Sequence, residues 1–330
     1  MSRVTARTVA PGLAILAGGA VLARALSELV GVHELLVAIG LGVVLANTLG
    51  VPERLEQGLN THSIWLAAGI VLLGASITLE AILETGAAVL LILLATVLVT
   101  LTTVELLARN VAGITDRFGS LLAAGASICG VSAVVAVGTS VRANESQIAY
   151  AAGIVLLMDA ITLVVYPLVG SYLELPDVVF GVWAGVSMLS TGPVVAVGFA
   201  YSEAAGQWAT ITKLARNVLI GAVVLGYASY YARSDADGSV TIRTLWETFP
   251  KFVVGFLVVV GLASFGAFSS SQQAFISSAV DWLFLLAFVG LGTAIRTADL
   301  RRLGPGPVLV VVAALTVASV FSLGVTLAVL

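Results

Sequence analysis

The residues from Gly125 to Gly138 read GASICGVSAVVAVG, and those from Gly185 to Gly198 read GVSMLSTGPVVAVG. The two stretches begin sixty positions apart, share a Gly-x-Ser opening and a VVAVG ending, and lie within long apolar segments. Glycine and small hydroxyl residues are unusual on a lipid-facing helix, but they suit a membrane helix that breaks and turns free backbone groups toward a polar cavity. The pattern predicts a membrane protein with two broken helices in its core.

The composition excludes several classes of protein. Of the 330 residues, 59% are hydrophobic and 10% are charged, whereas soluble domains carry about 25% charged residues. The net charge of -3 and the lack of any basic run argue against a nucleic-acid partner. With one cysteine, Cys129, and two histidines, no Cys/His cluster can form. We therefore expect an integral membrane protein with no metal and no cofactor.

Uncharged runs of about 18 or more residues are candidate membrane spans. They predict an all-α fold with about eleven transmembrane helices in a single domain over residues 1–330, with a short cytoplasmic linker at 233–249. We expect the first span to remain in the protein as a signal anchor. The predicted spans are about 8–29, 32–50, 64–83, 86–106, 119–141, 147–171, 178–200, 207–231, 251–268, 275–295 and 304–329.

Basic residues predict the orientation in the membrane, because lysine and arginine concentrate in cytoplasmic loops. In the eleven-span arrangement only Arg24 and Arg142 fall opposite the N-terminus. The bias predicts a multi-pass cell-membrane protein with a cytoplasmic N-terminus and an external C-terminus. Eleven basic residues fall on the N-terminal side: Arg3, Arg7, Arg54, Arg109, Arg117, Arg233, Arg243, Lys251, Arg296, Arg301 and Arg302.

A second internal similarity indicates an inverted repeat. The segment GIVLLGASITLEAILETG at 69–86 resembles AFVGLGTAIRTADLRRLG at 287–304, in the third and tenth predicted spans, which run in opposite directions. The similarity between 125–138 and 185–198 behaves differently, because the fifth and seventh spans run in the same direction. It reflects either convergent small-residue packing or a permuted repeat.

Small polar residues around the first predicted break are candidates for substrate binding. If the helix breaks at Gly130, the half-helix that follows would direct free N–H groups and a partial positive charge at the cavity, which favours an anion. The alternative is that these small residues merely allow close helix packing. The candidates are Ser127, Cys129, Gly130 and Ser132 on the first broken helix and Ser187 and Thr191 on the seventh span.

Among the ionisable residues inside predicted spans, where charge is costly and usually functional, we single out three. Lys213 and Arg216 are three residues apart and share a helix face. They would attract the anion or bridge to Asp159, and the alternative is that they snorkel to the external interface. Asp159, near the centre of the sixth span, is a candidate for cation coupling or counter-charge, against a purely structural ion pair.

Several short motifs, in order along nearly the whole chain, carry a resemblance to a known family. They are SICGVSAVVAV at 127–137 followed by Glu145 and AYA at 149–151, together with GIVLLG at 69–74, FGVWAG at 180–185 and KLAR at 213–216. The chain resembles the YeiH-like sulfate exporter family of prokaryotic membrane proteins. The resemblance implies export of sulfate or a similar small sulfur-containing anion. It also implies a plan similar to the sodium/proton antiporter and bile-acid symporter folds, whose inverted repeats cross two broken helices at mid-membrane.

The chain departs from that family within the second stretch. Many members have a histidine, an acidic residue and a glutamine where this chain has Leu189, Ser190 and Pro193. The missing imidazole and carboxylate imply a difference in coupling or specificity.

These observations together predict a secondary transporter for a small anion that works by alternating access in the lipid bilayer. One alternative is a cation-coupled antiporter or symporter in which Asp159 binds Na⁺ or H⁺, and another is a non-transporting scaffold or sensor. We expect no enzymatic activity, because no histidine is available at mid-membrane to activate a serine. A homodimer would supply a fixed partner surface for a moving bundle.

Overall fold

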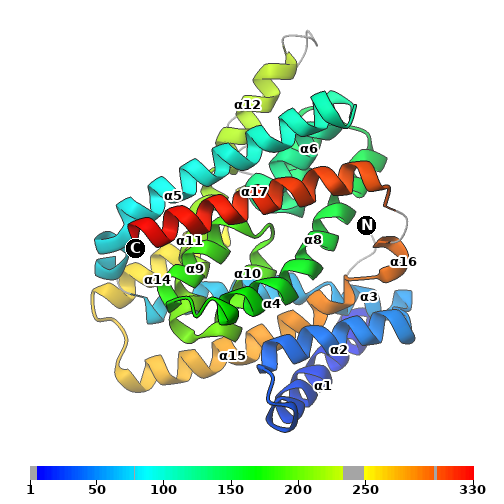
Figure 1. Ribbon diagram of the computed structural model, residues 1–330. Helices are drawn as coiled ribbons and strands as arrows, with labels where there is room; N and C mark the ends of the chain where they lie inside the picture. The colour runs from blue at the N-terminus through cyan, green and yellow to red at the C-terminus, as the bar shows by residue number, and fades with distance from the viewer. Residues whose placement is uncertain (1–5, 78, 233–248, 301–302) are drawn as a thin grey trace. The chain divides into compact units, whose positions relative to one another are not determined.

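The computed structural model describes residues 6–77, 79–232, 249–300 and 303–330, and these residues form helices and short connections (Figure 1). Contacts divide the chain into two compact units. Unit 1 contains residues 1–84 and 251–298, and unit 2 contains residues 85–250 and 299–330. The cytoplasmic linker predicted at 233–249 lies, up to residue 248, outside the described residues.

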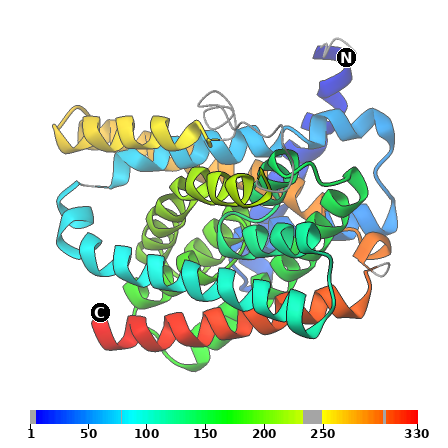
Figure 2. The same ribbon diagram turned by 90° about the horizontal axis from the view of Figure 1, so that it is seen from above.

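Unit 1 is built from helices that pack through glycine. The helix α15 packs on α2 and α4, and α14 lies alongside α4 (Figure 2). A Cβ on Gly42 of α2 would lie 2.1 Å from the carbonyl oxygen of Val289, and a Cβ on Gly292 would lie 2.2 Å from that of Ile39. The backbones of α2 and α15 are therefore in direct contact, as in tightly packed membrane helices. The helices are α1 (Ala6–Val30), α2 (Glu34–Thr48), α3 (Glu53–Leu59), α4 (His62–Leu73), η1 (Gly74–Ser76), α14 (Phe252–Ser264) and α15 (Ser270–Thr293).

Unit 2 is organised around α8 (Glu145–Tyr172), whose 28 residues are long enough to cross a membrane. Asn144 begins α8 by accepting a hydrogen bond from the Gln147 backbone N–H. The other helices of the unit are most of α5 (Leu79–Leu106), η2 (Leu107–Val111), α6 (Asp116–Ser127), α7 (Val131–Ser140), α9 (Asp177–Ser187), α10 (Thr191–Tyr201), α11 (Glu203–Val218), α12 (Ile220–Ala232) and α17 (Pro305–Val329). Along the sequence, the division between the units after residue 298 falls within the short α16 (Thr297–Leu300).

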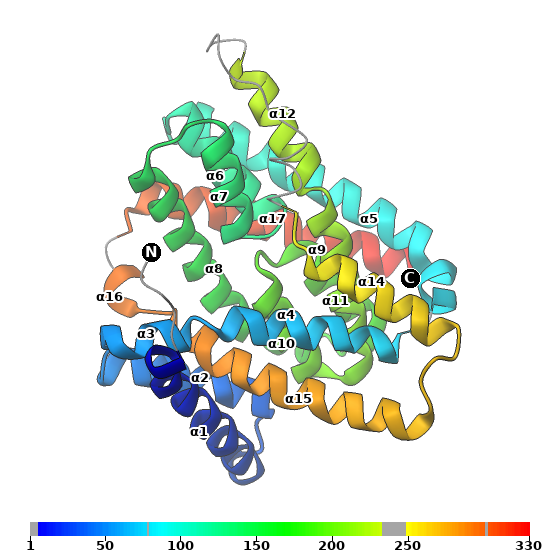
Figure 3. The same cartoon turned by 180° about the vertical axis from the view of Figure 1, so that it is seen from behind.

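The helices α6 and α7 form a hairpin, hairpin 1 (residues 116–140), with its tip at 128–130 (Figure 3). A Cβ on Gly125 would lie 2.7 Å from Val134, and one on Gly138 would lie 3.3 Å from Leu121. In a continuous helix, residues 121 and 138 would be about 26 Å apart. The chain therefore reverses direction at the tip, and α7 returns along α6.

The helices α9 and α10 form a second hairpin, hairpin 2 (residues 177–201), with its tip at 188–190. The rings of Phe180 and Tyr201, near its two ends, stack with centroids 3.8 Å apart. Both arms pack on α11. Gly185 of α9 and Gly198 of α10 both lie against Ala209 of α11.

The two hairpins approach the middle of α8 from opposite ends. The open end of hairpin 1 lies near the start of α8, where Gly138 packs on Ile148. The open end of hairpin 2 lies near the end of α8, where the Tyr201 hydroxyl donates to the Gly170 carbonyl oxygen. The tips meet between these ends, because a Cβ on Gly130 would lie 2.1 Å from the Ser190 hydroxyl oxygen.

This arrangement corrects the expectation of broken helices that cross the membrane at 119–141 and 178–200. Both stretches do break, and in equivalent places: α6 ends at Ser127 and α9 at Ser187, whereas α7 begins at Val131 and α10 at Thr191. Each second half folds back beside the first instead of continuing across. The similar stretches therefore run in opposite directions along α8, although the eleven-span arrangement had them parallel.

Among the described residues, seven helical segments are long and apolar enough to span a membrane. The four remaining predicted spans, at 32–50, 119–141, 178–200 and 251–268, contain shorter helices of 10 to 15 residues. The similar segments 69–86 and 287–304 both contain a point where the chain passes from unit 1 into unit 2. The seven long segments are Thr8–Val30, Glu53–Ser76, Gly86–Val111, Glu145–Tyr172, Glu203–Tyr231, Ser270–Thr293 and Pro305–Val329.

Candidate functional site at the hairpin tips

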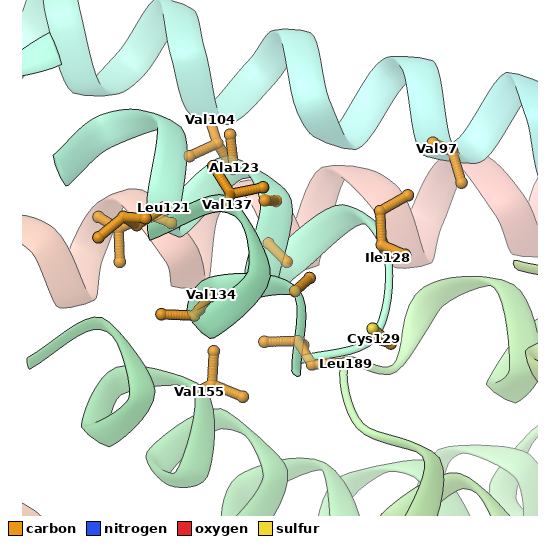
Figure 4. Packing of buried hydrophobic residues seen from close by; sticks show 14 of the residues in the cluster. Val97, Val104, Leu121, Ala123, Ile128, Cys129, Val134, Val137, Val155 and Leu189 are labelled. Atoms are coloured by element: carbon orange, nitrogen blue, oxygen red, sulfur yellow. The ribbon is translucent and has the colours of Figure 1, made fainter. Parts of the chain in front are cut away.

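Backbone geometry at the first tip depends on glycine. Gly130 has φ 68° and ψ -132°, a conformation that residues with a side chain rarely adopt. Its Cα also lies against Ser190 of the other tip, so there is no room for a Cβ. Cys129 of the first tip lies beside Leu189 of the second (Figure 4). The two breaks therefore form one site inside unit 2.

Lys213 on α11 holds both tips. Its side chain is fully buried, and its Nζ donates to the carbonyl oxygens of Ile128 (2.9 Å), Met188 (2.9 Å) and Leu189. These carbonyls follow the ends of α6 and α9, where unpaired C=O groups carry partial negative charge. The ammonium group thus satisfies backbone groups that helix breaks leave unpaired inside a membrane protein.

Arg216, one turn further along α11, has the same role. It is fully buried, and its Nε donates to the Ser127 carbonyl oxygen at 2.6 Å. Its Nη1 donates to Met188 O at 2.7 Å, and its Nη2 donates to Ala126 O. A guanidinium group has five N–H donors, so two remain beyond these three bonds. Neither basic residue snorkels to an interface, because both lie in the centre of unit 2.

Asp159 lies at the second tip from the α8 side. Only 3% of the residue is exposed, and its Oδ1 accepts a hydrogen bond of 3.1 Å from the Ser190 backbone N–H, directly before α10. A carboxylate at this position is stabilised by the positive end of the helix dipole. Lys213 is near enough to attract the carboxylate, but these residues form no ion pair within 4.0 Å in the described parts of the chain.

The structure brings together most of the residues that the sequence predicted. Ser127, Cys129, Gly130, Thr191, Lys213, Arg216 and Asp159 lie at or beside the tips. Ser187 does not offer a free hydroxyl, because it accepts from Tyr166 and donates to the Trp183 carbonyl oxygen. Ser132 is exposed on α7.

Sequence reasoning missed two residues on α11. Asn217 donates from Nδ2 to the Thr191 hydroxyl at 3.1 Å, and it lies four residues after Lys213 on the same helix face. That spacing could have identified it. Thr212 precedes Lys213 and is fully buried. Within the described residues, three buried side-chain atoms have no hydrogen-bond partner, namely Ser127 Oγ, Thr212 Oγ1 and Asn217 Oδ1. Ser127 ends α6 directly before the first tip, and Thr212 and Asn217 lie on α11, whose basic side chains bond both tips.

Comparison with known proteins identifies the family. A family described as "Conserved hypothetical protein 698" matches residues 11–311. The chain belongs to this family. A UPF0324 membrane protein of Nitratidesulfovibrio vulgaris is 33% identical over 277 residues, which cover 82% of this chain and 77% of that protein. A UPF0324 membrane protein of Clostridium tetani is 28% identical, over 84% and 83% of the two chains. Some relatives are longer, and the chain spans 48% of one of them.

These relatives and the apolar helices identify the protein as a multi-pass membrane protein of the UPF0324 family, as its motifs had predicted. Among solved structures, the sodium proton antiporter MjNhaP1 from Methanocaldococcus jannaschii matches with a TM-score of 0.31 and 13% identity, over 97% of this chain and 99% of that one. A likeness at this TM-score does not establish a shared fold.

Proposed function

We propose that this UPF0324 protein is a secondary transporter for a small anion, and that the hairpin tips of unit 2 bind the anion. The supporting observation is the balance of buried charge. Among the described residues, the buried charged side chains are Lys213, Arg216 and Asp159, which carry two positive charges and one negative charge. An uncompensated charge in a low-dielectric interior is costly. An anion at the tips would complete the balance.

The polar groups near the tips suit an oxyanion. Ser127 has a buried hydroxyl without a partner, as does Thr212, which packs against Gly185 of α9 just before the second tip. Arg216 retains two N–H donors beyond its three bonds to carbonyls. Sulfate or a similar small sulfur-containing anion presents oxygens that accept such hydrogen bonds. The substrate proposal therefore rests on donors and charge at the tips, together with the family resemblance.

The two hairpins support transport over a scaffold role. Non-helical backbone is tolerated at membrane depth where it is buried in protein or lines a cavity, and transporters use such breaks at their substrate sites. We interpret the hairpins as the two halves of an inverted repeat, because they have similar sequences and opposite directions along α8. Alternating access would come from movement of the hairpins of unit 2, and a homodimer would supply a fixed partner surface.

The hairpins also change the predicted sidedness of one loop. A hairpin that returns to its starting side adds no crossing, so the arrangement has two crossings fewer than the eleven-span prediction. The loop containing Arg142 then lies on the same side of the membrane as the N-terminus. That side carries twelve basic residues, and the other side carries only Arg24. This stronger bias supports the hairpin arrangement with a cytoplasmic N-terminus and an external C-terminus.

A second candidate is a cation-coupled antiporter or symporter centred on Asp159. The observation that favours it is the position of this buried carboxylate, whose contact with Ser190 links α8 to the second tip. Binding of H⁺ or Na⁺ to such a group would alter that contact. In this candidate Asp159→Asn abolishes cation coupling, whereas anion binding at the basic pair persists.

The test is uptake of labelled sulfate, sulfite and a small sulfonate into proteoliposomes, with and without imposed sodium and proton gradients. The native protein is compared with Lys213→Gln and with Gln207→Ala, a control at a half-buried position of α11 whose side chain bonds only Glu203 among the described contacts. Saturable anion flux in the native protein and in Gln207→Ala supports an anion transporter. Loss of that flux in Lys213→Gln protein that is recovered folded supports a site at the tips. Collapse of a cation gradient without anion flux favours the second candidate, and no flux under any condition favours a scaffold.

A further inference from the structure

We infer that Asp159 determines how many negative charges the tip site carries, so that a divalent anion is transported only together with one proton, whereas a monovalent anion needs none. This inference rests on the proposed function and names the coupling ion of the same site. It follows from the geometry of three buried charges on α8 and α11 and from the number of groups that could balance them.

The two basic side chains are structural parts of the tips. Lys213 and Arg216 together donate to five backbone carbonyl oxygens, those of Ala126, Ser127, Ile128, Met188 and Leu189. Loss of either charge would leave several of these carbonyls unpaired in the interior. These hydrogen bonds therefore favour the charged forms of both side chains, whether or not an anion is bound.

Asp159 is the group that can change charge. Among the described side chains, Lys213 on α11 is the ionisable group that interacts with Asp159. Arg216 and the Cys129 thiol of hairpin 1 interact in turn with Lys213, and Tyr166 of α8 interacts with Arg216. The helices α6, α7, α10 and α17 also pack on α8. Their sequences contribute no further ionisable residue except at the outer ends of the hairpins, at Asp116, Arg117 and Tyr201. No second carboxylate can take over its role in these segments.

The charge balance then separates two substrate classes. With Asp159 ionised, the site carries one net positive charge, and a monovalent anion makes it neutral. A divalent anion would leave one negative charge uncompensated in the interior, which is costly. A proton on Asp159 restores neutrality for the divalent anion. In both cases one net negative charge crosses per turnover, but only the divalent anion brings a proton with it.

Sulfate and methanesulfonate separate these cases, because their charges of two and one do not change between pH 5.5 and 8. Initial rates are measured in proteoliposomes with the membrane potential held at zero, with and without an inward proton gradient. For the native protein we expect sulfate uptake to rise by up to about tenfold per pH unit of the gradient, and methanesulfonate uptake to stay constant. In Asp159→Asn, sulfate uptake should persist and no longer respond to the gradient.

Thr162→Ser is the matched control, because Thr162 lies one turn from Asp159 on α8 and its hydroxyl donates to the Asp159 backbone carbonyl. This variant should keep the native gradient response. Sulfate flux that ignores the proton gradient, or methanesulfonate flux that follows it equally, overturns the inference but leaves the anion transporter in place. No flux of either anion by folded native protein overturns both. The comparison of two anions in the native protein does not depend on the variants folding.

Discussion

Replacing Gly130 by alanine should destabilise the protein by forcing the two hairpin tips apart. The backbone conformation of Gly130, with φ 68° and ψ -132°, costs a residue with a side chain about 1–3 kcal/mol. The new Cβ would lie 2.1 Å from Ser190 Oγ and 3.1 Å from Val155 Cγ1, and overpacking of this kind costs about 1–3 kcal/mol more. We therefore expect a loss of roughly 2–6 kcal/mol in the free energy of unfolding.

The assay is thermal unfolding of the purified protein in detergent. By the usual relation between stability and melting temperature for a chain of 330 residues, the Gly130→Ala protein should melt roughly 3–9 °C below the native protein. Gly221→Ala on α12 is the matched control, because no heavy atom lies within 4 Å of the position of its Cβ. That variant should be as stable as the native protein or gain about 0.5–1 kcal/mol, since alanine favours a helix over glycine.

A double-mutant cycle with Ser190→Ala tests whether the two tips touch. Ser190→Ala removes the oxygen that the new Cβ would meet, so the double variant should be more stable than the sum of the single effects by about 1 kcal/mol. The conformational strain at Gly130 should remain. A native melting temperature for Gly130→Ala, or effects that simply add, would refute the contact between the hairpins.

Three further predictions concern other parts of unit 2. Lys213→Gln loses the ammonium group that bonds three carbonyl oxygens of the two tips. It should lower the free energy of unfolding, measured by chemical denaturation, by about 3 kcal/mol or more. A loss below about 1 kcal/mol would contradict this prediction. Tyr201→Phe keeps the ring stack with Phe180 but loses the hydroxyl that donates to the Leu175 carbonyl oxygen at 2.7 Å. It should lower the free energy of unfolding, measured by thermal denaturation, by about 1 kcal/mol without changing flux. Loss of flux at native stability would contradict this purely structural role. Ser146→Cys, made in a Cys129→Ser background, places an exposed thiol directly after hairpin 1. This thiol should react with an impermeant maleimide added on the cytoplasmic side. Reaction from the outside would contradict the hairpin and support a helix that crosses the membrane at 119–141.

Much of the candidate site could be predicted from short-range patterns. Glycine beside small hydroxyl residues marked the break at Gly130, and the structure ends α6 at Ser127 and begins α7 at Val131. The spacing of Lys213 and Arg216 placed them on one helix face, and both donate to the tips. These features depend on residues near one another in the sequence, so local rules suffice to find them.

The role of the basic pair could not be predicted in the same way. Sequence reasoning assigned Lys213 and Arg216 to an anion or to Asp159, whereas their described hydrogen bonds go to backbone carbonyls more than twenty residues away. Every residue has a backbone carbonyl group, so the sequence does not indicate which carbonyls accept these hydrogen bonds. Only the fold determines which of them lose their helical partners and come to lie beside a buried cation.

The sequence by itself determined that the chain is a multi-pass membrane protein, that two similar stretches break at glycine-rich positions, and which family it belongs to, because composition, apolar run length and motifs are local properties. The tertiary structure alone decided that each broken stretch turns back as a hairpin. A hairpin and a crossing helix have the same apolar length, and the difference lies in where the second half packs. Here α7 returns along α6, α10 packs on α11, and Gly130 meets Ser190 where the tips converge.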